Sequence, residues 1–214
     1  GRGTATFMIG GEICTRSCKF CNTLTGKPLA LNPEEPANVA KSIQLMKLKH
    51  AVVTSVDRDD LPDQGAGHWV KTIQSIKQLN PETTLEVLIP DFQGNLELVD
   101  LVIEAAPEII SHNMETVRRL TPQIRSAAKY DVSLKVLNRI ATKGTVAKTG
   151  IMVGLGETDE EVYTLMDDVR AAGVSVLTIG QYLQPSRKHI PVSAYITPEH
   201  FEEYKSIALS KGFT

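Results

Sequence analysis

The sequence predicts an α/β fold, and within that class we expect a partial (β/α)6 TIM-like barrel. Three observations favour it. Short apolar runs alternate six times with longer amphipathic segments, which is the pattern of strand–helix units. The runs are nearly continuous in Val, Ile, Leu and Thr, as in parallel strands that are covered on both faces. All the cysteines follow the first run directly, where α/β folds place their sites. A doubly wound sheet would satisfy the same alternation.

Each element has its own signal. The expected strands are Thr4–Ile9, Ala51–Val56, Thr84–Ile89, Glu108–Ser111, Thr149–Leu155 and Val174–Leu183. The helices are recognised by apolar residues at helical spacing and by their end signals. Asn32-Pro33 marks the start of the first helix, and Asn80-Pro81 marks the end of the second. The third and fourth helices are indicated by apolar spacing over 96–102 and 134–140. A Thr158–Glu161 capping box begins the fifth, and Thr197-Pro198 begins the last. Leu134 and Val136 would also fit a strand.

Composition excludes several classes of protein. With 42% hydrophobic and 22% charged residues, the 214-residue chain resembles ordinary globular proteins, and its net charge of −2 argues against a general nucleic-acid binder. No apolar run approaches the ~20 residues that span a bilayer. The first residues do not read as a secretory signal, and three cysteines do not make a disulfide framework, so we expect a cytoplasmic location. Because the chain opens at Gly1 and not at Met, we expect residues 1–214 to be one domain trimmed from a longer protein.

The three cysteines lie within eight residues, at Cys14, Cys18 and Cys21, in the spacing C-x3-C-x2-C. Thiolates this close together can bind a soft metal or an iron–sulfur cluster. A structural zinc site usually has four protein ligands, so zinc would need a histidine such as His50 or His68. A [4Fe–4S] cluster on three cysteines keeps one iron open for a ligand, which is what catalysis requires. A metal-binding or redox-sensing module without enzymatic activity is the alternative.

This motif resembles that of the radical S-adenosylmethionine (SAM) enzymes, which carry C-x3-C-x-aromatic-C after a first strand. The resemblance extends along the whole chain to the lipoyl synthases. It rests on segments 3–9 (GTATFMI), 13–16 (ICTR), 53–60 (VTSVDRDD), 90–92 (PDF), 112–115 (HNME), 149–157 (TGIMVGLGE) and 181–187 (QYLQPSR).

The resemblance implies a sulfurtransferase. The three cysteines would hold a site-differentiated [4Fe–4S] cluster, and cleavage of SAM would give a 5′-deoxyadenosyl radical that activates C6 and C8 of an octanoyl chain on a lysine. The implied partners are octanoylated lipoyl carrier domains of 2-oxoacid dehydrogenases or of the glycine cleavage system, and an electron donor such as flavodoxin or ferredoxin. Neither nucleic acid nor a membrane is expected as a partner. A biotin-synthase-like radical SAM enzyme is the alternative within the superfamily.

The resemblance also implies contacts with SAM, while no side chain is assigned a catalytic role. Thr, Ser and Asp at the end of the second strand can accept hydrogen bonds from an ammonium group, and neighbouring Asn and Glu suit ribose hydroxyls. Glycines at 150, 154 and 156 would let the fifth strand approach a ligand closely and turn into the capped helix. The expected SAM-binding residues are Phe20, Thr54, Ser55, Asp57, Asn113, Glu115, Lys148, Glu157, Gln181 and Tyr182. A plain turn at 57–60, a solvated Lys148 and a core Tyr182 are the structural alternatives.

Two features of the lipoyl synthases are not found among these 214 residues. One is a second three-cysteine motif for an auxiliary cluster, and the other is a C-terminal Arg-Ser-Ser-Tyr segment. We therefore expect this polypeptide to cleave SAM without inserting sulfur.

A basic stretch adds a hint about partners. Between residues 118 and 148 the only acid is Asp131, and the basic residues are Arg118, Arg119, Arg125, Lys129, Lys135, Arg139, Lys143 and Lys148. Such a stretch could steer an acidic carrier domain, although a solvated helical face has the same composition.

Overall fold

The computed structural model describes residues 3–214 and has the predicted alternation of strands and helices. The six longer strands are hydrogen-bonded in the order β1-β4-β5-β6-β7-β8. Their bounds are β1 Thr4–Ile9, β4 His50–Ser55, β5 Thr84–Leu88, β6 Ile109–Ser111, β7 Val146–Val153 and β8 Val176–Gln181. The longer helices are α1 Glu35–Met46, α2 Ala66–Leu79, α3 Leu96–Glu104, α5 Tyr130–Thr142, α6 Asp159–Ala171 and α7 Pro198–Ser210. No helix of the described chain is long and apolar enough to cross a membrane.

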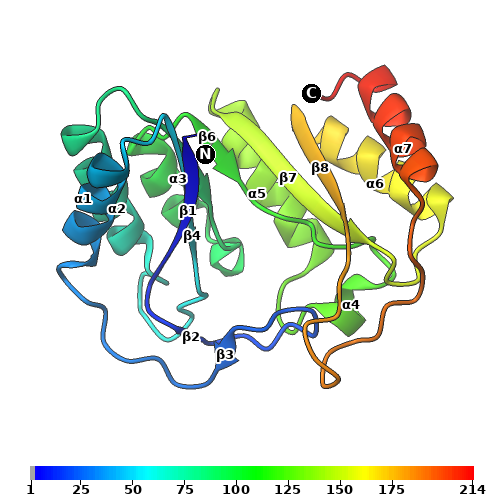
Figure 1. The fold of residues 1–214 in the computed structure, drawn as a ribbon, viewed down its shortest axis with the longest axis horizontal. Coiled ribbons are helices and arrows are strands. Elements are labelled where there is room, and N and C mark those ends of the chain that lie inside the picture. Colours follow the sequence, from blue (N-terminus) through cyan, green and yellow to red (C-terminus); the bar gives the residue numbers. More distant parts are fainter. Residues whose placement is uncertain (1–2) are drawn as a thin grey trace. The chain divides into compact units, whose positions relative to one another are not determined.

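The chain forms two compact units, one of residues 1–16 and 23–110 and the other of residues 17–22 and 111–214. In the first unit β1, β4 and β5 pair in parallel, with Ala51 opposite Ala5 and Leu85. Helices α1 and α2 pack against each other and lie on one side of β1 and β4 (Figure 1). Fully buried Ile43, Val53 and Ile73 form part of the core between them.

In the second unit β7 and β8 pair in parallel, and α5 packs against β7 and α6. The apolar residues of the predicted fourth helix, Leu137 and Ile140 among them, are buried in α5, so the helical alternative is the correct one there. The capping box of Thr158 and Glu161 is present at the start of α6, and the Thr197 side chain caps α7.

The structure departs from the prediction mainly at element ends. Helix α1 begins at Glu35, because the Asn32 side chain accepts a hydrogen bond from the Glu34 N–H and makes a turn before the helix. Strand β7 begins three residues before the expected start, and β8 ends at Gln181, so Leu183 lies exposed beyond it. The short elements β2 Ile13–Cys14, β3 Leu24–Thr25, η1 Phe92–Gly94 and α4 Thr121–Ile124 were not expected, since two to four residues carry no periodicity.

Candidate functional site

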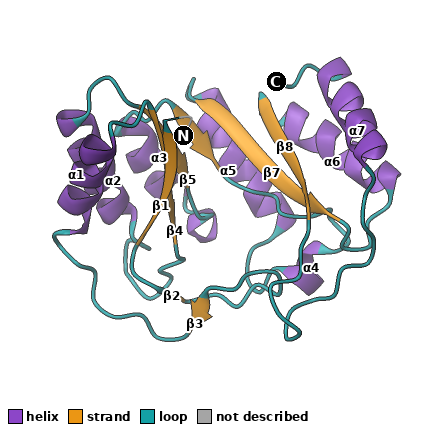
Figure 2. Ribbon diagram, viewed as in Figure 1, coloured by secondary structure: helices purple, strands orange, loops and turns teal. Residues whose placement is uncertain are grey.

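The cysteines lie in the long segment after β1, which is loop apart from β2 and β3 (Figure 2). All three are free thiols, but their exposure differs. Cys14 is buried in β2, Cys18 is half-buried and Cys21 is exposed. Cys14 belongs to the first unit, whereas Cys18 and Cys21 belong to the second.

In the first unit two backbone N–H groups point at the Cys14 sulfur. The Arg16 nitrogen lies 3.4 Å from Sγ and the Asp57 nitrogen lies 3.3 Å from it. The Asp57 carboxylate is also near, with Oδ2 at 3.6 Å. Burial raises the pKa of the Cys14 thiol, while the two N–H donors act in the opposite direction. The N–H donors stabilise negative charge on sulfur, as a thiolate ligand requires, while burial and the Asp57 carboxylate oppose it and leave the pKa raised.

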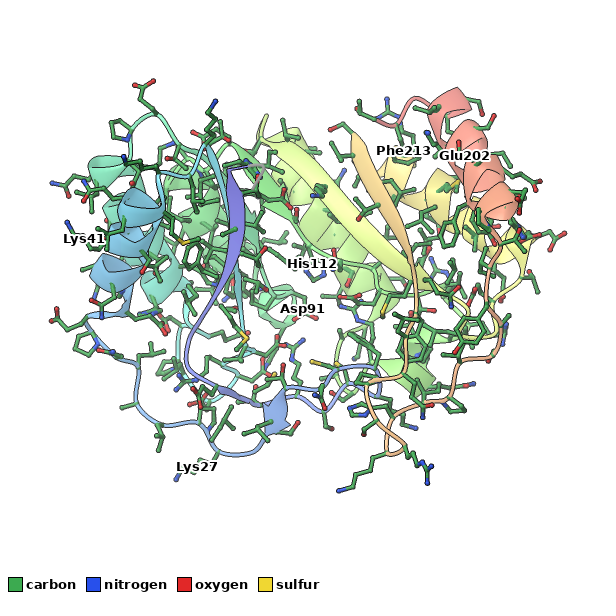
Figure 3. All side chains as sticks on the ribbon, in the orientation of Figure 1. Lys27, Lys41, Asp91, His112, Glu202 and Phe213 are labelled. Carbon is green, nitrogen blue, oxygen red and sulfur yellow. The ribbon has the colours of Figure 1, made fainter. Side chains whose placement is uncertain are left out.

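The Arg16 side chain lies buried among three carboxylates. Its Nε and Nη2 donate to the two oxygens of Asp59 at 2.7 and 2.8 Å, and Nη2 also donates to Asp91 at 2.8 Å. Asp57 is the third, with Oδ1 3.4 Å from Nε. Burial alone would raise the pKa of Asp59, but hydrogen bonds from Arg16 and Gln93 hold it below its ordinary value. For Asp57 burial prevails, and its pKa is raised. Asp91, labelled in Figure 3, follows β5.

A second buried arginine, Arg58, lies in the same segment with other partners. It forms a two-pronged pair with Asp60, at 2.9 Å on both contacts. It also donates to the carbonyls of Gly10 and Leu29, each at 3.0 Å. The segment VDRDD was expected to be either a SAM-binding strand end or a turn with an exposed ion pair. Its second and third acids, Asp59 and Asp60, hold two buried arginines, which is a structural function that the prediction missed. Contact of the strand end with SAM stays a prediction.

In the second unit the other half of the cysteine loop is held through its backbone. The Ser17 N–H donates to Ser126 Oγ at 3.0 Å, and Cys18 Sγ lies 3.9 Å from the same oxygen. From the segment after β8, His189 Nε2 donates to the Cys21 carbonyl at 3.0 Å, and the Ile190 N–H donates to the Lys19 carbonyl. These contacts leave the Cys21 side chain exposed.

Beside β7, the segment that follows β6 lies along the strand. The Glu115 N–H donates to the Gly150 carbonyl at 3.0 Å, and the His112 N–H donates to the Lys148 carbonyl at 3.0 Å. A Cβ at Gly150 would lie 2.9 Å from Thr178 Oγ1 and 3.0 Å from Asn113 Oδ1, so glycine lets these two side chains approach the strand closely. Burial raises the pKa of Glu115, against the opposing effects of Arg125 and Asn113.

Comparison with known proteins gives the family. A model of the Radical SAM superfamily matches residues 8–169. A lipoyl synthase of Parabacteroides distasonis is 78% identical over 212 residues, which are 99% of this chain and 75% of that protein. A lipoyl synthase of Treponema denticola is 62% identical over 99% of this chain and 73% of its own. The chain belongs to the lipoyl synthase family.

Solved structures show the same fold at low identity. Methylornithine synthase covers 97% of this chain and 63% of its own, with a TM-score of 0.74 and 14% identity. HydG, a maturase of the [FeFe]-hydrogenase, covers 98% of this chain and 49% of its own, with a TM-score of 0.75 and 15% identity. With the parallel strand order, these matches confirm the partial (β/α)6 TIM-like barrel of the radical SAM type. A lipoyl synthase-type chain is an enzyme, and its cofactors are a [4Fe–4S] cluster and SAM. The alternatives of a biotin-synthase-like enzyme and of a sensor module are thereby set aside.

The residues of the cysteine loop fit an iron–sulfur cluster of this family. Three free thiols provide a sulfur donor set, and Cys14 already receives two N–H donors. The zinc alternative loses its support, because His50 contacts Thr84 and Glu86 while His68 contacts Glu35 at 2.5 Å. Among residues 3–214 no three His, Cys, Asp or Glu side chains are gathered as metal ligands, so joint ligation by the three cysteines stays a prediction.

The expected SAM-binding residues have different surroundings, and their contacts with SAM remain predictions. Thr54 and Ser55 lie half-buried at the end of β4, Phe20 lies in the cysteine loop, and Asn113, Glu115 and Lys148 border β7. Three others bind the chain itself. The Glu157 carboxylate accepts hydrogen bonds from the N–H groups of Gly154 and Leu155. The Gln181 amide contacts the Ala194 carbonyl and the Ile196 N–H, and the buried Tyr182 hydroxyl donates to the Ile190 carbonyl.

The basic stretch is partly neutralised within its own unit. Arg118 lies over the Tyr130 ring and pairs with Asp131, and Arg119 forms a two-pronged pair with Glu161. Arg125 is buried and donates to Ser133. Lys135 and Lys143 are exposed on and just after α5. A surface that attracts an acidic partner would therefore depend on these lysines more than on the arginines.

Proposed function

We propose that Cys14, Cys18 and Cys21 hold the [4Fe–4S] cluster with which this chain cleaves SAM. The observation that carries the proposal is a loop of three free thiols, of which the buried one receives two N–H donors within 3.4 Å. When bound, the cluster supplies the electron that cleaves SAM into methionine and a 5′-deoxyadenosyl radical. The protein holds the thiols and the nucleotide in place and excludes water from the reaction.

The reaction is that of the lipoyl synthase family: sulfur insertion at C6 and C8 of a protein-bound octanoyl-lysine to form the lipoyl cofactor. The substrate is thus part of a lipoyl carrier protein. We propose that the carriers are 2-oxoacid dehydrogenase subunits and the carrier protein of glycine cleavage, with flavodoxin or ferredoxin as electron donor. A cytoplasmic location, where thiols stay reduced, suits the three free cysteines.

Deuterium transfer tests this function without depending on an auxiliary cluster. The reconstituted protein is given dithionite, SAM and an octanoyl-lysine peptide deuterated at C6 and C8. We expect 5′-deoxyadenosine that carries deuterium, measured by mass spectrometry. A peptide deuterated only at C2 is the control and should give unlabelled 5′-deoxyadenosine. Unlabelled product from the first peptide, or no 5′-deoxyadenosine at all, would contradict the proposal.

For SAM itself, we propose that the space beside β7 receives part of the molecule. Gly150 brings the Asn113 side chain close to the strand, and the Glu115 N–H is hydrogen-bonded to the carbonyl of this same glycine, so two of the expected SAM-binding residues lie together there. The Glu115 carboxylate can accept hydrogen bonds from two ribose hydroxyls, and the Lys148 ammonium can pair with the carboxylate of the methionine part. The ammonium group of the methionine part would donate hydrogen bonds to Thr54, Ser55 and Asp57, which lie at and just after the end of β4.

Glu115→Gln and Lys148→Ala should each weaken SAM binding by about 10- to 150-fold, because a hydrogen bond to a charged group contributes about 1.5–3 kcal/mol. Calorimetric titration measures the affinity. Iron content should stay at the level of the unmodified chain, since neither residue belongs to the cysteine loop. Lys143→Ala, at an exposed lysine just after α5, is the matched control. Normal SAM affinity in both variants would show that the nucleotide is placed wrongly.

A further inference from the structure

Arg16 stands between two cysteines of the loop, but its side chain turns away from solvent. Only 5% of it is exposed, and it contacts carboxylates that follow two neighbouring strands, Asp59 after β4 and Asp91 after β5. One guanidinium thus fastens the cysteine loop to the ends of two strands of the first unit. Thr15 adds to this, since its hydroxyl lies 3.0 Å from both the Asp57 carbonyl and Asp59 Oδ2.

These contacts form a closed ring around the Cys14 sulfur. The Arg16 N–H and the Asp57 N–H both point at Sγ, and the two residues lie on different segments of the chain. The pair between Arg16 and Asp59, two residues beyond Asp57, joins those segments through two hydrogen bonds of 2.7 and 2.8 Å. Thr15 also joins the two segments, through its N–H and hydroxyl on the Asp57 carbonyl, but only the Arg16 pair acts on the residue whose own N–H reaches the sulfur, so breaking it frees that donor.

We propose that Arg16 is a positioning residue that keeps two N–H donors on the Cys14 sulfur and thereby raises the reduction potential of the cluster. The inference rests on the proposed ligation by Cys14. Reduction adds negative charge to the cluster and its sulfurs, and N–H donors stabilise that charge, so losing a donor lowers the potential. A lysine keeps the positive charge but lacks the planar fork that binds Asp59 through two nitrogens.

The chain offers a matched control in Arg58. It is equally buried, with 4% of its side chain exposed, and it forms the same two-pronged pair with an aspartate, Asp60. Its other partners are the Gly10 and Leu29 carbonyls, so its side-chain hydrogen bonds differ from those of Arg16, although its backbone lies between Asp57 and Asp59. Replacing Arg58 by Lys disturbs a buried charge to a similar degree without touching the donors.

The test compares Arg16→Lys, Asp59→Asn, the double variant and Arg58→Lys after anaerobic reconstitution. The readouts are iron per chain and the potential from a reductive titration followed by electron paramagnetic resonance. For Arg16→Lys, which keeps the positive charge, we expect about a tenfold lower equilibrium constant for one-electron reduction, which is about 59 mV more negative. Asp59→Asn breaks the same pair but also removes a negative charge, which raises the potential, so its readout is the iron per chain, which should fall. The double variant should lose no more iron than Asp59→Asn, because both changes break one pair. Arg58→Lys should lower the melting temperature and leave the potential unchanged.

Circular dichroism establishes that each variant is folded. Loss of iron from folded Arg16→Lys or Asp59→Asn, with iron retained by Arg58→Lys, also supports the proposal. Unchanged iron in Asp59→Asn overturns it, even if Arg16→Lys does not fold. An equal shift in Arg58→Lys overturns it too. Cys14→Ala separates this outcome from the proposed function: a cluster retained there refutes the ligation itself, whereas its loss leaves only the role of Arg16 in question.

Discussion

Replacing Cys21 by alanine is expected to remove the iron from the reconstituted protein and to lower reductive SAM cleavage by at least about 100-fold. Two thiolates cannot hold the cluster against loss. Even a change to a residue that only contacts a metal ligand lowers metal affinity or activity by about 10- to 100-fold. Cys21 is the best of the three cysteines for this test, because its side chain is exposed and the contact from His189 is made to its backbone carbonyl. Its loss should therefore leave the fold unchanged.

Asn22→Ala is the control for Cys21→Ala, since Asn22 is the exposed neighbour in the same loop. Iron and sulfide analysis, 5′-deoxyadenosine formation and thermal unfolding are measured on both. The melting temperature should be the same for both variants, and Asn22→Ala should keep its iron. Four irons per chain in Cys21→Ala, or a fall in melting temperature that accounts for the loss of iron, would show that the assignment of Cys21 is wrong.

The sequence predicted strands and helices best where a local sequence signal, such as a capping box or apolar periodicity, belongs to an element with a buried face. The strand Thr4–Ile9, the capping box at Thr158 and the helix around Leu137 are all present as predicted. Their signals depend on neighbouring residues only, so periodicity and capping are sufficient to find them. The cysteine motif is equally local, since its three thiols lie within eight residues.

The partners of Arg16 could not be predicted in this way. Asp59 and Asp91 are 43 and 75 residues away along the chain, and no periodicity relates them to the loop. The available signal was the arginine itself, a charged residue between two cysteines, followed by acids just beyond two predicted strands. Because the carboxyl ends of adjacent parallel strands meet at one edge, that combination could have suggested a buried ion pair.

The glycines of the segment 149–157 show a second limit. They were expected to bring the strand close to a ligand and to let the chain turn into the capped helix. At Gly150 the atoms that come close belong to the chain itself, since a Cβ would meet Thr178 and Asn113. At Gly154, too, the chain itself lies close. The Gly154 carbonyl accepts from the N–H groups of Ser193 and Ala194, and a Cβ would overlap with the Ala194 carbonyl oxygen and the Gln181 amide. Sequence spacing cannot distinguish these two reasons for a glycine.

Gly154→Ala should accordingly lower the free energy of unfolding by about 2–5 kcal/mol. Its φ of +92° lies in a region that costs a side-chain-bearing residue about 1–3 kcal/mol, and overpacking against backbone adds about 1–3 kcal/mol. For a chain of this size the melting temperature should fall by roughly 2–4 °C per kcal/mol. The Ala194 oxygen is backbone held by the Gln181 amide, so neither atom can move aside without breaking a hydrogen bond.

Gly180→Ala is the matched control for Gly154→Ala. Gly180 lies in β8, its φ is not in the left-handed region, and an added Cβ would meet nothing within 4 Å. Its stability should change by no more than about 0.5 kcal/mol, or increase slightly because alanine restricts the unfolded chain. Urea unfolding followed by circular dichroism measures both variants. Equal stability of the two variants would mean that the 193–196 segment does not pack against Gly154. A lower SAM affinity of Gly154→Ala at unchanged stability would support the expectation that the strand approaches the ligand at this glycine.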